Sequence, residues 1–204
     1  MACIQSYPPR TIKELRNILQ LVDSSNPVVA LMLEMSALTG LRYSDCSTLT
    51  IKEVTINGVL RESISVVQKK GYKKRLSSGM AEPAARRAAT VRVSFSDQAK
   101  ELIEEAVRLN PGGTLLFESD RKRGFPYSAQ YVNRILKSAA VKLKLTYPLS
   151  SHSFRKAFAL MLIENGAKSH TVRDLLGHAS LASTDHYLST FMSDNDGHVA
   201  KLKF

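Results

Sequence analysis

The side chains of this sequence best placed for chemistry are His152 and Arg155, three residues apart. Ser150 and Ser151 precede them, and either is a good N-cap, so both residues fall in the first turn of a predicted helix. Phe154 points the other way, into a core. A guanidinium and an imidazole beside the free N–H groups of a helix start can hold a phosphate. The spacing by itself also fits an ordinary surface pair.

A second candidate group is the run Leu175-Leu176-Gly177-His178, followed nine residues later by Tyr187. Gly177 ends a predicted helix and leaves His178 on the turn after it. A tyrosine hydroxyl near a histidine can act as a nucleophile, although most tyrosines pack through the ring and hydrogen-bond through the hydroxyl. The pair leaves both interpretations open.

A third candidate is Arg42, which follows a predicted buried helix and a glycine in Thr39-Gly40-Leu41-Arg42. An arginine held toward the interior in this way needs an anion. Asp45 lies one turn later, so an internal Arg42–Asp45 ion pair is the structural interpretation.

Taken in order, these residues resemble the tyrosine recombinases, the phage integrase family. That family carries Arg, Lys, His-x-x-Arg, His or Trp, and Tyr along the chain. The resemblance extends from about residue 11 to residue 188, and each motif is only modestly specific, whereas the ordered set is highly specific. The matching positions are Arg42, Lys69, His152, Arg155, His178 and Tyr187, with Asp45 behind them.

The lysine is the least certain match. In the family it lies at the end of the second strand or in the turn after it, commonly in Lys-Thr-Gly. Here the stretch is Val67-Gln68-Lys69-Lys70-Gly71, and Lys69 matches by its distance from the glycine. Three nearby lysines compete with it for the role of general acid: Lys70, Lys73 and Lys74.

The resemblance implies a DNA strand transfer through a covalent tyrosine intermediate, without metal or cofactor. Tyr187 would attack the scissile phosphorus and form a 3′-phosphotyrosyl link, His152 would accept its proton, and Lys69 would protonate the leaving 5′-oxygen. Arg42, Arg155 and His178 would stabilise charge on the phosphate, and Asp45 would orient Arg42 or His152. We expect a site-specific DNA recombinase. The alternatives are a type IB topoisomerase-like or telomere-resolving enzyme, and a non-catalytic DNA-binding relative.

The charge supports a polyanionic partner. The chain has 204 residues and 29 Lys+Arg against 18 Asp+Glu, a net charge of +11. Residues 61–92 hold nine basic residues and two acidic ones (+7), residues 121–144 hold seven basic residues and no acid (+7), and the rest is therefore −3. Such blocks are typical of a phosphate-backbone footprint, although a solvated face with a basic loop fits them too. The predicted DNA contacts are Lys70, Lys73, Lys74, Arg75, Arg121, Lys122, Arg123, Arg134 and Lys137.

These residues need elements to position them. Periodicity and caps predict helices over residues 11–22, 27–39, 43–49, 97–109, 127–145, 151–165, 168–176 and 183–189. Alternating patterns predict strands at 54–56, 64–66 and 91–95, with an Asn57-Gly58 turn, and a short extended piece at 115–117. Residues 70–89 form a long connection that is either functional or mobile. The expected fold is α+β and mostly helical, like a tyrosine-recombinase catalytic domain, with a three-stranded antiparallel sheet at one edge.

The expected domain organisation is a lead-in (1–10), a catalytic domain (11–188) and a tail (189–204), without the core-binding domain usual in the family. The longest apolar run has seven residues, so nothing is expected to span a membrane. Two cysteines form no disulfide framework, and a cytoplasmic, nucleoid-associated protein is the simpler interpretation. The expected partner is double-stranded DNA. We expect a homotetramer on DNA in the synaptic complex and a monomer when the protein is free, with accessory DNA-bending proteins as further candidates.

Overall fold

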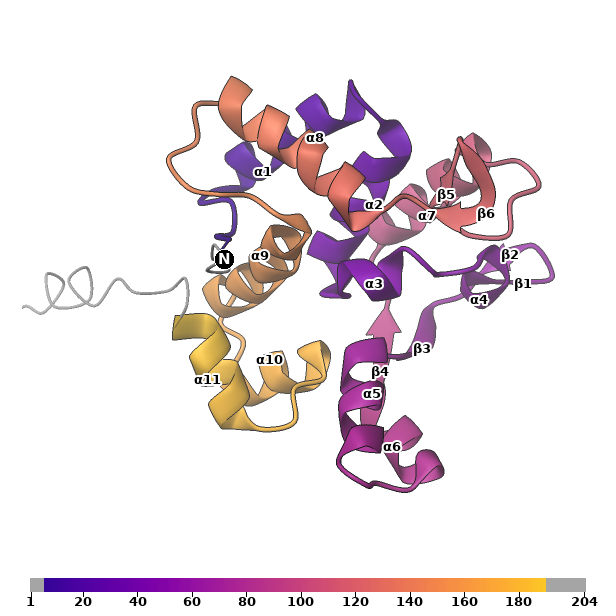
Figure 1. The fold of residues 1–204 in the computed structure, drawn as a ribbon, viewed down its shortest axis with the longest axis vertical. Helices are drawn as coiled ribbons and strands as arrows, with labels where there is room; N and C mark the ends of the chain where they lie inside the picture. Colours follow the sequence, from indigo (N-terminus) through magenta and orange to yellow (C-terminus); the bar gives the residue numbers. More distant parts are fainter. Residues whose placement is uncertain (1–5, 190–204) are drawn as a thin grey trace, which may run out of the picture.

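Most of the chain is helical, as the periodicity predicts (Figure 1). The computed structural model describes residues 6–189. Its helices are α1 (Ile12–Asp23), α2 (Pro27–Thr39), α3 (Tyr43–Cys46), α4 (Ile51–Val54), α5 (Lys69–Ser77), α6 (Glu82–Ala89), α7 (Asp97–Leu109), α8 (Ala129–Lys142), α9 (Ser151–Glu164), α10 (Ser169–Leu176) and α11 (Leu181–Ser189). Its strands are β1 (Thr55–Ile56), β2 (Val59–Leu60), β3 (Ser63–Val67), β4 (Thr90–Ser94), β5 (Glu118–Ser119) and β6 (Lys122–Pro126).

Side-chain caps start several of these helices where the sequence predicts them. The Thr11 hydroxyl accepts from the Glu14 N–H at 3.1 Å, and Asn26 caps α2 with Pro27 in its first turn. The Glu14 carboxylate accepts from the Arg10 N–H at 2.6 Å instead of from Thr11, so the second bond of a capping box does not form. These local bonds satisfy N–H groups that a helix start would leave open.

Helix α2 forms the centre of the core. It is apolar on most sides, and α1, α7 and α9 pack around it. Leu33 and Met35 from α2 and Phe154 from α9 are almost completely buried in one cluster with residues of α1, α7 and α8. Since Phe154 lies between His152 and Arg155, this packing fixes how α9 presents both of them.

The mostly helical fold with small antiparallel sheets is confirmed, but the strands do not form one three-stranded sheet. Within residues 6–189, β1 pairs with β2 across the Asn57-Gly58 turn, β3 pairs with β4, and β5 pairs with β6. The first predicted strand is shortened because Val54 ends α4, so only Thr55 and Ile56 remain to pair with Val59 and Leu60. The expected piece at 115–117 makes a single bridge between Leu115 and Thr50.

The connection over residues 70–89 is not a loop, because it folds into α5 and α6. Lysine, arginine and alanine are good helix formers, and Pro83 lies in the first turn of α6, where a proline is tolerated. The Tyr72 hydroxyl donates to Glu82 at 3.0 Å and joins the two helices. Lys69 is therefore the first residue of a helix, not part of a strand or hairpin turn.

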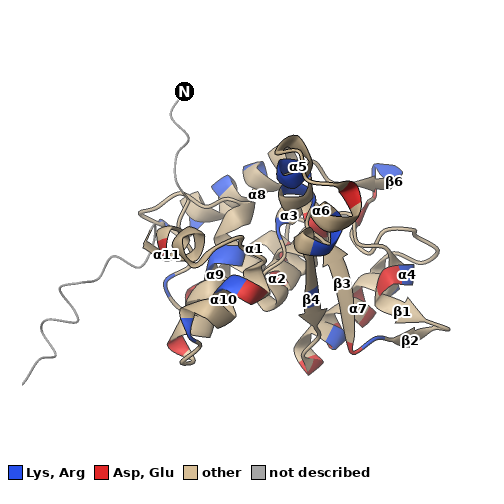
Figure 2. Ribbon diagram, turned by 90° about the horizontal axis from the view of Figure 1, so that it is seen from below, with Lys and Arg blue, Asp and Glu red and all other residues tan. Residues whose placement is uncertain are grey.

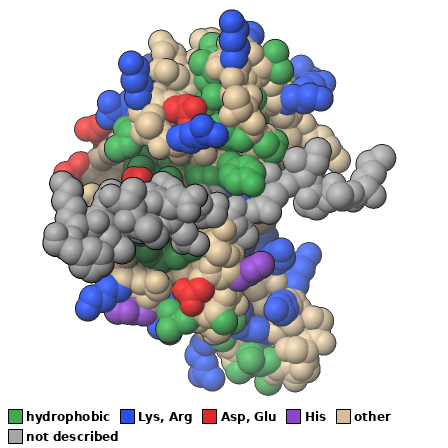
Figure 3. Space-filling view, turned by 90° about the vertical axis from the view of Figure 1, so that its left-hand side faces the viewer, with side chains coloured by type: hydrophobic (Ala, Val, Ile, Leu, Met, Phe, Trp, Pro, Cys, Tyr) green, Lys and Arg blue, Asp and Glu red, His purple; other side chains and the backbone are tan. Residues whose placement is uncertain are grey.

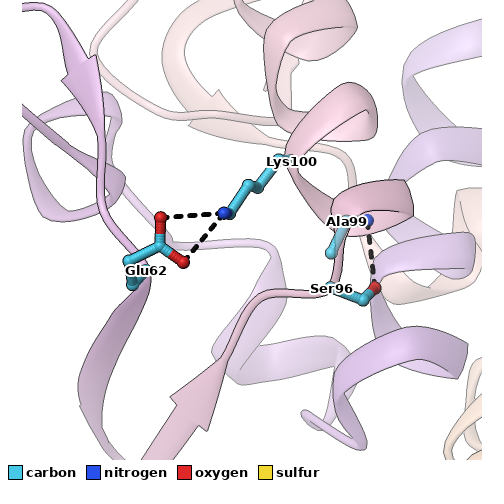
Figure 4. Close-up of polar contacts among 4 residues, drawn as sticks. All are labelled: Glu62, Ser96, Ala99 and Lys100. Atoms are coloured by element: carbon cyan, nitrogen blue, oxygen red, sulfur yellow. Dashed lines mark hydrogen bonds and ion pairs between the residues drawn. The ribbon is translucent and has the colours of Figure 1, made fainter.

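Helix α7 is tied to the strands by an ion pair (Figure 4). Lys100 Nζ lies 2.8 Å from the Glu62 carboxylate, just before β3, and Ser96 caps the helix by accepting from the Ala99 N–H at 3.3 Å. This pair joins the helical core to the sheet that leads to α5.

Other helix bounds differ slightly from the predicted ones. The helix expected at 43–49 ends at Cys46, the one at 127–145 spans Ala129–Lys142, and the one at 183–189 begins at Leu181. Residues 1–5 of the expected lead-in and 190–204 of the expected tail lie outside the described residues. Among residues 6–189, no helix combines the length and the apolarity needed to cross a membrane.

Candidate active site

Arg155 is the most buried of the predicted catalytic residues, with 2% of its surface exposed. Its Nη1 donates to the Gly40 carbonyl at the end of α2, and its Nη2 donates to the Leu176 carbonyl at the end of α10, at 2.7 Å. Both acceptors lie at helix C-termini, whose partial negative charge favours a cation. Burial lowers the pKa of Arg155 to about 10, so the side chain stays charged at neutral pH. A guanidinium has five N–H groups, so further donors remain for a phosphate.

Two glycines form these helix ends. Gly40 and Gly177 both have positive φ, at 69° and 63°, and each lies one residue beyond its helix. A Cβ on Gly40 would lie 2.5 Å from the Phe158 ring, which packs directly against this turn. The left-handed turns aim the helix ends at Arg155 and need glycine for steric reasons.

Gln68 is a site residue that the sequence reasoning missed. It is 2% exposed, its Oε1 accepts from Arg42 Nη1, and its Nε2 donates to the Leu176 carbonyl at 2.9 Å. Arg42 and Arg155 are therefore connected through one amide and one carbonyl. The sequence feature that could have identified Gln68 is the alternation of the strand. Gln68 continues the series Ile64 and Val66, which faces inward, but with a polar side chain.

The expected Arg42–Asp45 ion pair is not among the ion pairs of the described residues. Asp45 is buried, and its Oδ1 accepts from the Lys69 backbone N–H at 3.2 Å. Burial lowers the pKa of Arg42, and the nearby charge of Asp45 opposes that shift. Asp45 thus acts on Arg42 through its field, and by hydrogen bonding it holds the start of α5.

Among the described residues, the hydrogen bond that the Lys69 ammonium makes is to a hydroxyl group and not to a group that holds Arg42 or Arg155. Lys69 Nζ donates to the Thr48 hydroxyl at 2.6 Å. Lys70 contributes to lowering the pKa of His152, so its charge acts on that ring.

His152 lies at the start of α9, and cationic side chains from α9 and from other elements surround it. Its backbone N–H donates to the Ser150 hydroxyl at 3.2 Å, which is the predicted cap. Desolvation, followed by the charges of Arg155 and Arg42, lowers the pKa of His152 below its usual 6.5. The ring is therefore mostly neutral at pH 7 and able to accept a proton.

His178 and Tyr187 contact each other edge to face, with ring centroids 5.2 Å apart and planes at 79°. His178 Nδ1 lies 3.0 Å from the hydroxyl of Thr184, a buried residue that sequence reasoning also missed, three residues before Tyr187 on α11. Burial lowers the pKa of His178 to about 4. Burial raises the pKa of Tyr187 to about 12, and the charges of Arg155 and Arg42 partly oppose that rise.

Lys156 connects this region to the start of the described chain. It is mostly buried, and its Nζ donates to the Ser6 carbonyl at 2.7 Å and lies 5.9 Å from the Tyr187 ring centroid. The Ser6 hydroxyl also accepts from Ser150, the N-cap of α9, at 2.8 Å. The segment that leads into α1 thus supports the helix that carries His152 and Arg155.

The predicted DNA contacts lie on different elements. Figure 2 shows the Lys- and Arg-rich parts of α5, α8 and β6 on one side, and Figure 3 shows further Lys and Arg on the upper and lower parts of another face. Two of the basic side chains are hydrogen-bonded within the protein, since Arg123 Nη1 donates to Asn110 at 3.3 Å and Arg75 Nη1 donates to the Gly71 carbonyl at 3.1 Å. Arg75 is half-buried, and the exposed ones are Lys70, Lys73, Lys74, Arg121, Lys122, Arg123, Arg134 and Lys137.

The residues that the structure describes contain no group of three or more His, Cys, Asp or Glu side chains arranged to hold a metal ion. The described arrangement consists of two anchored guanidiniums, two mostly neutral histidines and one tyrosine. Such a set suits the transfer of a phosphoryl group to a hydroxyl, with charge stabilised by fixed cations.

Comparison with known proteins identifies the family of the chain. The sequence model of the phage integrase family matches residues 10–193. The chain is 28% identical over 187 residues to tyrosine recombinase XerC of Bacillus subtilis, covering 86% of this chain and 54% of XerC. It is also 32% identical over 168 residues to tyrosine recombinase XerD of Bifidobacterium longum, covering 80% of this chain and 51% of XerD. The chain thus spans about half the length of the curated relatives that it matches.

A solved structure shares the fold. The catalytic core of lambda integrase aligns with a TM-score of 0.63 at 20% sequence identity, covering 85% of this chain and 92% of that core. At such identity the likeness establishes the fold, and the site is argued from its own residues.

Proposed function

The chain belongs to the phage integrase family, and from this membership we propose that it is a site-specific DNA recombinase. It would cleave and rejoin DNA strands through a covalent 3′-phosphotyrosyl intermediate, with residues 11–188 as the catalytic unit. The names of its relatives favour a recombinase over a topoisomerase-like, telomere-resolving or non-catalytic protein.

One observation carries the proposal: two anchored guanidiniums act on the hydroxyl of one tyrosine. The charges of Arg155 and Arg42 both act to lower the pKa of Tyr187, so both guanidiniums lie within electrostatic reach of its hydroxyl. A phosphodiester that accepted hydrogen bonds from both would lie next to the nucleophile. Guanidinium groups fixed in this position stabilise the negative charge that develops on the non-bridging oxygens of the phosphate.

In the proposed step the Tyr187 oxygen attacks the scissile phosphorus, and the bond from phosphorus to the 5′-oxygen breaks. Since burial raises the pKa of Tyr187 to about 12, the hydroxyl needs a base, and the mostly neutral His152 accepts its proton. A lysine at the start of α5, Lys69 or Lys70, gives a proton to the leaving 5′-oxygen. Reversal by another 5′-hydroxyl rejoins the strand.

His178 would donate a hydrogen bond to the same phosphate. With a pKa of about 4 it is neutral at pH 7, so one ring nitrogen carries the proton. If the Thr184 hydroxyl donates to Nδ1, that proton is on Nε2, which can donate to a phosphate oxygen. Thr184 is on this basis a positioning residue.

The proposed partner is double-stranded DNA, in the cytoplasm with the nucleoid. The Tn1549 transposon integrase, solved in complex with circular intermediate DNA, has the same fold with a TM-score of 0.67. We expect four copies to join two duplexes during strand exchange, with accessory DNA-bending proteins as further partners.

The central test is covalent capture. We expect the wild-type chain to become attached to nicked DNA that carries its recombination site, because the nick lets the 5′-product diffuse away. Tyr187→Phe removes the attacking oxygen and should give no attachment, measured by gel shift under denaturing conditions. Tyr72→Phe, which removes only a hydroxyl group that donates to Glu82, is the matched control and should attach normally. Attachment by the Tyr187→Phe variant would contradict the assignment.

A second test separates the candidate lysines. Lys69→Ala should slow cleavage of an ordinary phosphodiester, because the 5′-oxygen then leaves without a proton, but it should cleave a 5′-bridging phosphorothiolate as fast as wild type. The measurement is the rate of covalent capture on both substrates. Lys70→Ala is tested in parallel. Rescue confined to the Lys70 variant would move the general acid to Lys70.

A further inference from the structure

Lys156 is a buried lysine beside the candidate active site, and the cleavage step proposed above does not use it. It is 7% exposed, although lysine side chains are rarely buried without a partner. Its Nζ donates to the Ser6 carbonyl at 2.7 Å. The same Nζ lies 5.9 Å from the ring centroid of Tyr7 and 5.9 Å from that of Tyr187. A carbonyl oxygen and aromatic rings attract an ammonium, so these surroundings suit the charged form of the side chain.

The segment that supplies the Ser6 carbonyl is itself held in place. The Ser6 hydroxyl accepts from Ser150, the N-cap of α9, at 2.8 Å. The Tyr7 N–H donates to the Pro148 carbonyl at 3.2 Å, and the Tyr7 ring contacts the Tyr147 ring edge to face, with centroids 6.4 Å apart. The acceptor of the ammonium is thus bonded to the chain directly before α9, and this fixes the position of the ammonium relative to that helix.

The Tyr187 ring on α11 has two neighbours that restrain it. The His178 ring contacts it edge to face at 5.2 Å between centroids, and the Lys156 ammonium lies 5.9 Å from its centroid. An aromatic ring attracts a cation at this range. A nucleophile that is held near its attacking position before the substrate arrives loses less freedom in the reaction, and reaction rates depend strongly on such placement.

Lys156 also lies close to the proposed base. It follows His152 by four residues, which puts both side chains on the same side of α9, one turn apart. Burial lowers the pKa of His152 most, and four cations add to this effect: Arg155, Arg42, Lys70 and Lys156. A phosphate bound by the two guanidiniums would offset their charges with its own. Lys156 would then be the buried cation that still disfavours a charged imidazole.

We propose that Lys156 is a positioning residue for the cleavage step: anchored on the Ser6 carbonyl, its ammonium restrains the ring of Tyr187 and lies one helical turn from His152. This inference rests on the proposed function, because it takes Tyr187 as the nucleophile and His152 as the base. Lys156 transfers no proton in this role. It holds the nucleophile in place and keeps the base in its neutral form, ready to accept the tyrosine proton.

The test compares Lys156→Met, which removes the ammonium and keeps a long side chain, with Lys156→Arg, which keeps the charge. The rate of covalent capture on nicked DNA is measured between about pH 5 and pH 8, where a histidine titrates. Because His152 must be neutral to accept the proton, capture slows as the pH falls through its pKa. Loss of a nearby positive charge raises that pKa, so the acid limb of Lys156→Met should move to higher pH by about half a unit.

At pH 7 the Lys156→Met variant should also be captured about 10-fold more slowly, since its tyrosine ring is less well placed. Lys156→Arg should keep the wild-type acid limb and part of the rate. The control, Lys13→Met on α1, makes the same change in net charge at an exposed position and should match the wild type in both respects. A lysine with only a packing role would change the rate or the stability and leave the acid limb in place.

A titration that needs no catalysis separates this inference from the proposed function. The pKa of His152 is read from its ring signals by NMR, assigned with His152→Gln, and should rise in Lys156→Met. An unchanged pKa of His152 would overturn the proposal, as would an unchanged acid limb, and capture by the wild type would leave the recombinase standing. A raised pKa without wild-type capture would support the action of Lys156 on His152 and contradict the recombinase. Thermal unfolding verifies each fold, and Lys156→Gln, which can still donate to the Ser6 carbonyl, takes the place of a methionine variant that does not fold.

Discussion

At the scale of single residues, the two guanidiniums of the site depend on the groups that hold them. The Leu176 carbonyl accepts from both Arg155 and Gln68, and Gln68 in turn accepts from Arg42. An amide side chain carries an acceptor and a donor on neighbouring atoms, so Gln68 makes both bonds in one orientation. Gln68 is therefore the residue that sets the spacing of the two guanidiniums.

Replacing Gln68 with leucine should slow cleavage about 10- to 100-fold, because Arg42 loses its acceptor and an unpaired buried group costs about 1–3 kcal/mol. The measurement is the rate of covalent capture. Gln98→Leu is the control, since Gln98 is exposed and bonded only to Glu34, and it should cleave at the wild-type rate. A Gln68→Leu variant with wild-type cleavage would show that Arg42 does not need this anchor.

At the scale of elements, the C-terminal ends of two helices hold the buried arginine of the site. Arg155 is held by the carbonyl ends of α2 and α10, and each of those helices ends in a glycine with positive φ. A Cβ on Gly177 would overlap Val91 and lie 3.0 Å from Gln68 Nε2. The turn after α10 can therefore approach β4 and Gln68 only without a side chain.

The glycine turns give a stability prediction. Gly177→Ala should lower the free energy of unfolding by more than about 2 kcal/mol, because the left-handed backbone costs about 1–2 kcal/mol and overpacking adds to it. Gly79→Ala is the matched control, since Gly79 has a φ of 82° and no atom within 4 Å of an added Cβ. It should show the backbone cost alone in denaturant unfolding. Equal losses at both positions would mean that the close approach to β4 is unimportant.

At the scale of the whole molecule, the net charge of +11 is arranged by the fold. The basic parts of α5, α8 and β6 share one side in Figure 2. Cations elsewhere are used differently, as Lys100 and Arg108 on α7 are paired with Glu62 and Glu105. The basic parts of α5, α8 and β6 thus form one Lys- and Arg-rich side, and further Lys and Arg lie on another face in Figure 3.

This arrangement predicts strongly salt-dependent binding. If six or more phosphates are contacted, affinity for duplex DNA should fall on the order of 10³-fold between about 50 and 200 mM salt, with the same slope for unrelated sequences. Lys73→Ala with Lys74→Ala should lower the slope by about 1.8. The control, Lys100→Ala with Arg108→Ala, should leave it unchanged. Equal slopes for both double variants would contradict a DNA contact by α5.

The sequence by itself determined most of the helices and the chemical groups. Thr11, Asn26, Ser96 and Ser150 cap helices at their predicted starts, because capping depends on residues a few positions apart. The order of the arginines, histidines and Tyr187 was enough to identify the family.

Only the tertiary structure decided how these groups are held. Gln68 between the arginines, the Leu176 carbonyl on Arg155 and the pairing of β3 with β4 all join segments far apart in the chain. The conformation of residues 70–89 was also decided only by the tertiary structure, since the composition of this segment fits a basic loop as well as two helices. Contacts of this kind depend on how α2, α9 and α10 pack together. Local periodicity and spacing in the sequence do not determine that packing.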